Sequence, residues 1–352
     1  MRIDIRILDE DFEPIAIIDD FTSLMWNTNF YKDGFFEMYC PELHFEIFEK
    51  GRYMARKGSK YTAYITDIGI ENYECFATGT FLEKMLEERT ILQFEDYTGT
   101  VEDVMHALVI KNCISTDGDR VIPRLQDGTN NHFGEKITFN GFGKSVLKAL
   151  SELAEAYSIS FFIERQRTDI GMTTLLFNTF AGVNRTQKQE ENEWVQFRKS
   201  FDNIVSEKYE TNKNYPNVAL VYGRGEGSER TSVSVDKRNG EQRREIYVDA
   251  RDIVKEETMS ESAYRNLLIQ RGNETLDKNK KVENISCDVD ITVKMNFDLG
   301  DICTYKYERI NRIFELRVTE IRETFESSRI EKKIVFGNQS LGLIEFIQKQ
   351  AG

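Results

Sequence analysis

The sequence predicts a β-rich α+β fold, in which a β-rich part at each end of the chain encloses mixed helical and strand segments. Apolar and charged residues alternate over residues 2–8, with the two-residue period of a half-buried strand. The same alternation returns over residues 314–319, near the other end. Between these ends, several segments carry apolar residues at three- and four-residue steps, the pattern of amphipathic helices.

The composition is that of an ordered protein with enough residues for two or three hydrophobic cores. The chain has 352 residues, of which 40% are hydrophobic and 12% aromatic. It has no run of about 18 apolar residues, and its N-terminus lacks a basic stretch followed by an apolar one. The sequence therefore predicts no stable membrane insertion, and synthesis and folding in the cytoplasm.

Residues 1–96 form the first predicted domain, which consists mainly of strands and is closed by one helix. Asp33 and Gly34 stand between two aromatic-rich runs, as the turn of a tight hairpin does. Thr80 and Glu83 have the spacing of a capping box, with an apolar stripe behind them. These two residues therefore predict the start of the closing helix.

Residues 97–190 form a predicted mixed α/β domain. Thr100, with Asp103 three residues later, predicts the start of one helix, and a second helix is predicted over residues 145–157. Residues 187–192 are polar and charged, which predicts a hinge or long loop. We therefore expect a domain boundary there.

The second predicted β-barrel domain combines residues 191–250 with residues 282–340. A helical insertion, residues 251–281, separates its two halves, and residues 341–352 form a C-terminal tail. Ile321 interrupts the alternation of the last long strand, which predicts a bulge or the end of that strand.

The charge balance disfavours nucleic-acid binding. Acidic residues number 60 and basic residues 47, which gives a formal net charge of −13. Such a surface repels phosphate backbones unless basic residues are locally concentrated. It suits the wall of a duct through which DNA slides without sticking.

No group of residues predicts catalysis, a cofactor or a metal site. The glycine-rich residues 223–228 lack the lysine and the following helix of a phosphate-binding loop, so they predict a loop between strands. The histidines, His44, His106 and His132, fall on different predicted elements. His106 lies off the apolar stripe of its helix, which predicts a solvated or interface position.

The cysteines are odd in number and far apart. They are Cys40, Cys75, Cys113, Cys287 and Cys303. No two have the spacing of a zinc or redox motif, so buried free thiols are predicted.

Short motifs along nearly the whole chain follow one another in an order found in a known family. They lie in residues 2–41, 78–89, 99–108, 201–209, 217–228, 243–252, 299–302 and 316–321. Together they resemble the siphophage tail-hub family, whose members are called baseplate hub or tail-associated proteins and are similar to the central hub of contractile phage baseplates.

The resemblance implies a structural protein of the virion with two β-barrel-like domains per chain. A homotrimer of such chains presents six near-equivalent sites to the hexameric tail tube. The implied partners are the distal tail protein, the tape measure protein, and tail fibres, receptor-binding proteins or lysins. The hub would take part in host attachment and genome ejection, gating a channel through which DNA passes without specific binding. Longer members carry lytic or fibre-binding extensions, so those roles are expected of other proteins.

Two alternatives from other functional classes remain open: a cell-wall glycan hydrolase and a carbohydrate-binding module of the tail tip. Hydrolysis needs two carboxylates held across a cleft. A binding module would use exposed aromatic side chains such as Tyr31, Phe35 or Trp194, for which burial is predicted instead. A contractile tail or a bacteriocin-like particle could use a similar hub, although the motifs look more like those of siphophages.

Overall fold

Strands dominate the computed structural model of the chain, which describes residues 3–94, 96–167, 171–227, 230–255, 259–279, 283–326 and 329–337. The chain divides into two compact units. Met1–Lys208 and Ile285–Gly352 belong to the first unit, and Tyr209–Asn284 form the second. Each unit is described by itself.

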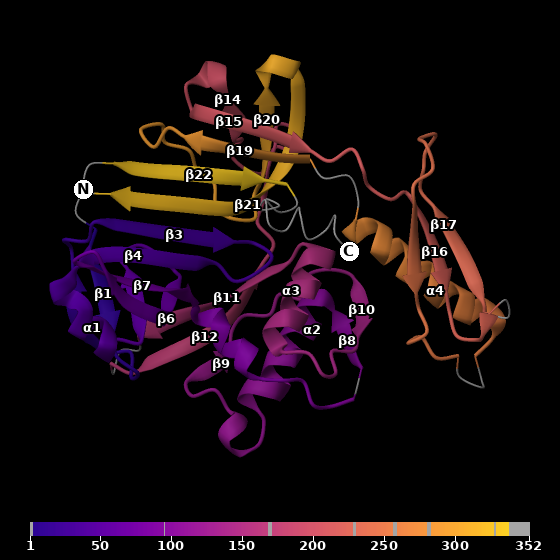
Figure 1. Cartoon of the computed structure of the whole chain (residues 1–352), viewed down its shortest axis with the longest axis horizontal. Coiled ribbons are helices and arrows are strands. Elements are labelled where there is room, and N and C mark those ends of the chain that lie inside the picture. The colour runs from indigo at the N-terminus through magenta and orange to yellow at the C-terminus, as the bar shows by residue number, and fades with distance from the viewer. Residues whose placement is uncertain are drawn as a thin grey trace. The chain divides into compact units, whose positions relative to one another are not determined.

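Fourteen strands among the described residues form one large sheet, most of it within the first unit. These strands are β1 (Ile5–Leu8), β2 (Pro14–Ile18), β3 (Ser23–Asn29), β4 (Phe35–Pro41), β5 (Tyr53–Arg56), β6 (Thr62–Glu71), β7 (Glu74–Phe81), β13 (Asn184–Arg185), β14 (Gln196–Arg198), β15 (Ile204–Thr211), β19 (Glu283–Val289), β20 (Ile302–Tyr307), β21 (Arg312–Glu326) and β22 (Ile330–Phe336). The main path of neighbours is β15-β19-β22-β21-β3-β4-β7-β6-β5-β1-β2, and β20 joins β13 and β14 to β21. Figure 1 shows β19, β22, β21, β3 and β4 running side by side.

The N-terminal part of this sheet alternates as its sequence predicts, with one correction. Short helical segments α1 (Phe45–Lys50), Glu42–His44 and Leu82–Glu88 accompany its strands. The predicted capping box is wrong, because Thr80 still belongs to β7 and Phe81 precedes the 3-10 turn without a capping side chain. The Glu83 side chain instead accepts a hydrogen bond from the backbone N–H of Ile163 at 2.9 Å.

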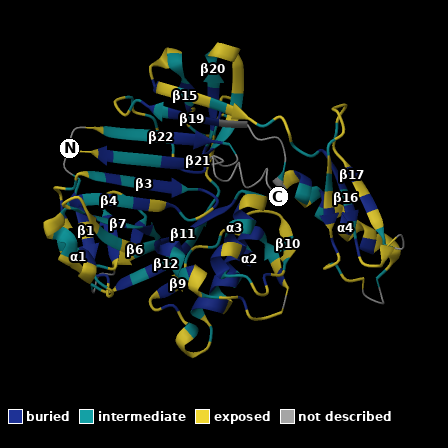
Figure 2. Cartoon of the chain, viewed as in Figure 1, coloured by how far each residue is buried: buried dark blue, intermediate teal, exposed yellow. Residues whose placement is uncertain are grey.

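The middle of the chain is mixed, as predicted. Its elements are β8 (Tyr97–Thr100), α2 (Val101–Val109), β9 (Leu125–Asp127), β10 (Lys136–Phe139), α3 (Val146–Tyr157), β11 (Ser160–Arg167) and β12 (Thr173–Phe180), with helical turns at Ile110–Ile114 and Gly118–Arg120. The capping box of α2 is confirmed, because Thr100 and Asp103 exchange side-chain to backbone hydrogen bonds of 3.0 and 3.2 Å. Ser145 caps α3 in the predicted place. Buried residues dominate α2 and α3 in Figure 2, whereas exposed residues gather in the loops.

The last strands continue beyond the predicted interruption. Lys199–Phe201 and Glu308–Ile310 form short turns, and β21 extends to Glu326. A register shift against β22 lies between Val318 and Glu320, close to Ile321. Of the two predicted alternatives, the bulge is therefore confirmed close to Ile321, and the end of the strand at that residue is wrong.

The second unit has its own sheet and core. It contains β16 (Val218–Tyr222), β17 (Ser232–Asp236), β18 (Glu245–Asp249) and α4 (Glu261–Lys278). β16 lies between antiparallel β17 and parallel β18. Tyr264, Leu268 and Leu276 of α4 pack against the valines of this sheet. Helix α4 lies within the predicted helical insertion, residues 251–281.

The β-rich α+β class is confirmed, with mixed material between two β-rich parts. Closure of each part as a barrel, and the domain boundaries after residues 96, 190, 250, 281 and 340, stay predictions. The predicted C-terminal tail, residues 341–352, lies outside the described residues.

Candidate functional site

The two β-rich parts of the first unit join at a seam between β3 and β21. These strands pair antiparallel over seven residues, from Ser23 opposite Glu326 to Asn29 opposite Glu320. β3 continues the N-terminal strands and β21 the C-terminal ones. One uninterrupted hydrogen-bonded sheet therefore contains strands from both ends of the chain.

One face of this sheet forms a hydrophobic core. Its residues come from alternate positions of each strand, since successive side chains of a strand point to opposite faces. Leu24 and Trp26 of β3 lie in this core with Phe36, Met38 and Phe325. The neighbouring positions along β4 and β7 are half-buried or exposed.

We call the opposite side of β3, β4, β6, β7, β19, β21 and β22 the polar sheet face, defined by residues that the registers of these strands bring to it. Its members are Met25, Asn27 and Asn29 of β3, Phe35, Glu37 and Tyr39 of β4, Asp67 and Glu71 of β6, Glu74, Phe76, Thr78 and Thr80 of β7, Asp288 of β19, Glu320, Arg322, Thr324 and Glu326 of β21, and Glu331 and Lys333 of β22. Carboxylates greatly outnumber the two cations, Arg322 and Lys333. The face therefore carries net negative charge.

Local interactions reinforce this negative character. Glu37, and after it Glu71 and Glu74, raise the pKa of the Tyr39 hydroxyl, because phenolate formation beside carboxylates is unfavourable. Arg322 donates to Glu320 at 2.9 Å, so part of the positive charge on this face is neutralised within it. An anion that approaches the face meets repulsion.

A second group of polar side chains lies in the middle of the chain, around His106. The predicted solvated position of His106 is wrong. That side chain is buried rather than solvated. Its Nδ1 donates to Asp127 at 2.6 Å, and its Nε2 lies 3.4 Å from the Thr179 hydroxyl. The threonine hydroxyl donates to Glu102, which also accepts from the backbone N–H groups of Asn131 and Phe133.

The group of Asp127, His106 and Thr179 has the residue types of a catalytic triad. A nucleophilic hydroxyl needs its proton directed to the histidine base. Here the Thr179 proton is directed to Glu102 instead. The group therefore ties α2, β9 and β12 together, and we assign it a structural role. His44 and His132 lie elsewhere, paired with Asp20 and Asp103.

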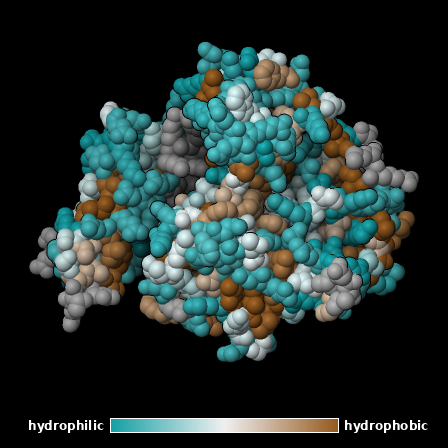
Figure 3. Space-filling view, turned by 180° about the vertical axis from the view of Figure 1, so that it is seen from behind, coloured by the Kyte–Doolittle hydropathy of each residue, from teal (hydrophilic) through white to brown (hydrophobic). Residues whose placement is uncertain are grey.

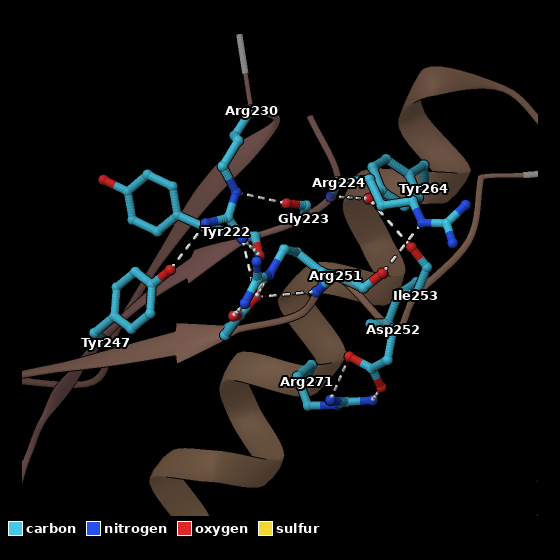
Figure 4. A network of polar contacts seen from close by, with 11 residues as sticks. Tyr222, Gly223, Arg224, Arg230, Tyr247, Arg251, Asp252, Ile253, Tyr264 and Arg271 are labelled. Atoms are coloured by element: carbon cyan, nitrogen blue, oxygen red, sulfur yellow. Dashed lines mark hydrogen bonds and ion pairs between the residues drawn. The ribbon is translucent and has the colours of Figure 1, made fainter. Parts of the chain in front are cut away.

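The glycine-rich loop of the second unit is a loop between strands, as predicted, over its described residues 223–227. Arg230 ties this loop to the sheet by donating to the carbonyls of Gly223 and Tyr222, to Asp249 and to the Tyr247 hydroxyl (Figure 4). Arg251 also pairs with Asp249. These guanidinium groups are occupied by the protein's own acceptors, which supports a structural role for the network.

The aromatic side chains considered for sugar binding differ in burial. Tyr31 is buried as predicted, whereas the predictions for Phe35 and Trp194 are wrong, at 38% and 55% exposure. The Trp194 indole donates to the Gln189 carbonyl at 2.7 Å, which holds the ring on its loop. Figure 3 shows hydrophobic residues in separate patches within a largely hydrophilic surface. Isolated exposed apolar residues are common on folded proteins and do not define a site.

Metal-binding clusters and membrane-spanning helices are both absent from the residues that the structure describes. No group of three or more His, Cys, Asp or Glu side chains is arranged there to hold a metal ion. None of the described helices is both long and apolar enough to cross a membrane. The five cysteines are free and buried, as predicted.

The sequence profile of one family matches almost the whole chain. This family is described as Siphovirus ReqiPepy6 Gp37-like protein, and the match covers residues 4–338. No match is found among curated proteins.

Three solved structures of tail proteins resemble this chain in fold. Prophage tail protein gp18 from Listeria monocytogenes EGD-e is 12% identical, with a TM-score of 0.53 over 100% of this chain and 98% of that one. A tail protein from Neisseria meningitidis MC58 is 12% identical, with a TM-score of 0.54 over 96% of each chain. The 43 kDa tail protein of prophage MuSo2 from Shewanella oneidensis is 10% identical, with a TM-score of 0.55 over 95% of this chain and 96% of that one. These likenesses show a shared fold.

Proposed function

Because the chain belongs to the Siphovirus ReqiPepy6 Gp37-like protein family, we propose that it is a structural hub of a phage tail tip or baseplate. It acts as a homotrimeric ring that joins the tail tube, through the distal tail protein and the tape measure protein, to host-binding or lytic components. It is assembled in the host cytoplasm, carried in the virion, and gates the channel for DNA. Its role is mechanical, without catalysis or a cofactor.

The observation that carries this proposal is the polar sheet face, which extends across the seam between β3 and β21. Duplex DNA carries one negative charge per about 1.7 Å of its axis. A channel wall rich in carboxylates keeps that polyanion moving, because it offers few cations to hold the phosphates. We assign the polar sheet face to the channel wall and the opposite, apolar face to the core.

The exposed edges of the large sheet support assembly of copies into a ring. Among the strands that the structure describes, β2 and β15 stand at the two ends of the main path of the sheet. Ile15 and Ile17 of β2 and Val205 of β15 are exposed. An edge strand offers backbone hydrogen-bonding groups to another chain. Contact between unlike edges of successive copies closes a ring when the rotation fits. Two β-rich parts in each of three copies then match a sixfold tube.

Two measurements test this function. Immunogold labelling of phage particles is expected to mark the tail end farthest from the head, and light scattering of the purified chain is expected to give a trimer at all concentrations tested. Label elsewhere on the particle would contradict the tail-tip position. A strict monomer would contradict self-assembly and make the ring dependent on partners.

A carbohydrate-binding module is the second candidate, favoured by the half-exposed ring of Trp194. A fixed aromatic face of this kind can pack against the apolar side of a sugar ring. Pull-down with host cell walls would distinguish the two functions. Binding that is lost in Trp194→Ala would support the module, whereas no binding by the unmodified chain would contradict it. The hydrolase alternative predicts turnover of cell-wall glycan by the same purified chain.

A further inference from the structure

Two of the five thiols face each other across neighbouring strands. Cys40 of β4 is directly opposite Cys75 of β7 in their antiparallel register. Their Sγ atoms are 3.4 Å apart, and both side chains are fully buried on the core face of the sheet. The two sulfurs are therefore already in contact.

The surroundings leave this pair close to the surface even though it is buried. Cys75 is the second residue of β7 and follows the turn that contains Tyr73, which is 88% exposed. Cys40 is followed by Pro41, whose carbonyl accepts a hydrogen bond from Cys75 Sγ at 3.3 Å. Pro41 is the last residue of β4, so the pair lies beside the end of that strand. Fraying of the last residues of these strands would expose both sulfurs.

We propose that Cys40 and Cys75 are a dithiol that becomes a cross-strand disulfide by exchange with a small-molecule disulfide such as oxidised glutathione. One cysteine thiolate attacks the oxidant and releases one thiolate from it. The second cysteine thiolate then attacks the resulting mixed disulfide, forms the Sγ–Sγ bond and releases the second. Two electrons pass from the cysteines to the oxidant, and the two cysteine protons are taken up by the released thiolates.

Formation of the disulfide needs only a small movement of the two sulfur atoms. A disulfide has a sulfur separation of about 2.05 Å, so the two Sγ atoms must approach by roughly 1.4 Å. Side-chain rotation at directly opposed residues of an antiparallel pair can supply most of this movement. The other three cysteines lie on other elements than β4 and β7. Cys113 follows α2, Cys287 is on β19 and Cys303 is on β20.

Burial also predicts a slow reaction in the folded protein. It raises the pKa values of the Cys40 and Cys75 thiols, and the thiolate is the reactive form. A reducing cytoplasm keeps such pairs as thiols, whereas the medium outside the cell favours disulfides. We therefore expect the bond to form after the particle leaves its host. This timing depends on the proposed function, whereas the pairing depends only on the geometry.

The bond would stabilise the fold by closing a loop that contains α1, β5 and β6. A cross-link reduces the conformational freedom of the unfolded chain more than that of the folded one. It would also fasten β4 to β7, two strands that contribute to the polar sheet face.

The experiment uses the purified full-length chain, incubated with or without oxidised glutathione, then denatured and alkylated. Peptide mass mapping is expected to find Cys40 linked to Cys75 after oxidation, with Cys113, Cys287 and Cys303 alkylated. The oxidised chain is expected to have a Tm several degrees above that of the reduced chain. Five alkylated cysteines after oxidation, or a link between other cysteines, would overturn the proposal.

Variants and particles separate the pairing from its timing. Cys75→Ala is expected to show neither the link nor the gain in Tm, whereas Cys113→Ala is expected to keep both. If Cys75→Ala does not fold, peptide mapping of the unmodified chain still decides. Particles purified without reductant are expected to contain the link. A reduced pair in particles, with a link formed readily in the purified chain, would overturn the timing and leave the pairing supported.

Discussion

Arg56 donates from Nη2 to Glu323 Oε2 at 2.5 Å, although the two residues are 267 positions apart in the chain. Arg56 belongs to β5 in the N-terminal part, and Glu323 to β21 in the C-terminal part. The guanidinium group also lies over the rings of Trp26 and Phe325, at 5.3 and 5.1 Å. This contact reinforces the seam from the core side of the sheet.

Loss of this ion pair is expected to weaken the seam. Glu323→Gln removes the negative charge and leaves a largely buried guanidinium, with 14% of the Arg56 side chain exposed, without its counterion. We expect the free energy of unfolding to fall by about 1–3 kcal/mol, measured by urea unfolding. The matched control is Glu13→Gln, which removes the half-exposed pair with Arg167 and should cost about 0–1 kcal/mol. Equal losses in the two variants would contradict a special role for the seam pair.

Lys60 connects three parts of the first unit. Its Nζ lies 4.8 and 4.7 Å from the ring centroids of Phe162 and Phe180, and 3.5 Å from Asp298. Lys60→Met keeps most of the side-chain volume and removes the charge, so the cation–π and ionic attractions are lost. We expect a loss of about 1–2 kcal/mol in unfolding free energy, and faster hydrogen exchange in β11 and β12.

The exposed cation Lys188 is the control for Lys60. It pairs with Glu315 at 2.9 Å, with 77% of its side chain exposed. Lys188→Met is therefore expected to change stability by less than about 1 kcal/mol. Unchanged exchange in β11 and β12 of the Lys60 variant would show that the aromatic rings hold those strands without the cation.

Glu83 predicts a dependence of stability on pH. Burial, aided by the neighbouring charge of Asp33, raises the pKa of its carboxyl from 4.5 to about 7. One of its oxygens is buried without a hydrogen-bond partner, so the ionised form is poorly compensated. The folded chain therefore holds a proton that the unfolded chain releases between about pH 4.5 and 7. Stability falls as the pH rises through this window.

Glu83→Gln is expected to remove this part of the pH dependence. The variant can keep the acceptor for the Ile163 N–H. It should gain stability relative to the unmodified chain on going from pH 5 to pH 8, by at most about 3 kcal/mol. Urea unfolding at both pH values measures the difference, with exposed Glu49→Gln as the control. A constant difference between the two pH values would contradict the raised pKa.

The elements predictable from sequence are those fixed by local chemistry. Thr100 and Asp103 satisfy backbone N–H groups within one turn, and Ser145 does the same, so these residues indicate where α2 and α3 begin. Thr80 and Glu83 have the same spacing, but they do not form a capping box. Glu83 is drawn to the backbone of Ile163, eighty positions away, and this long-range contact is absent from the local pattern.

The polar sheet face was also predictable only in part, because some of its features depend on local sequence and others on contacts between distant residues. Alternation within β4 or β7 indicates that each strand has one polar side, but the meeting of β3 and β21 depends on residues about three hundred positions apart. His106 was misassigned for a related reason. Its partners Asp127 and Thr179 come from β9 and β12, and they satisfy a side chain that the helical pattern alone places outside the core.

The assignment of the polar sheet face to the channel predicts an effect of charge reversal on genome ejection. Glu37→Lys combined with Glu331→Lys introduces two cations on β4 and β22, where they would attract passing phosphates. Phage particles with this chain are expected to assemble in normal number and to eject DNA several-fold more slowly, with the delay relieved by added salt because salt screens the attraction. Glu46→Lys with Glu49→Lys makes the same change in charge on exposed positions of α1 and should leave the rate unchanged. If both double variants eject at the normal rate, the polar sheet face does not line the channel.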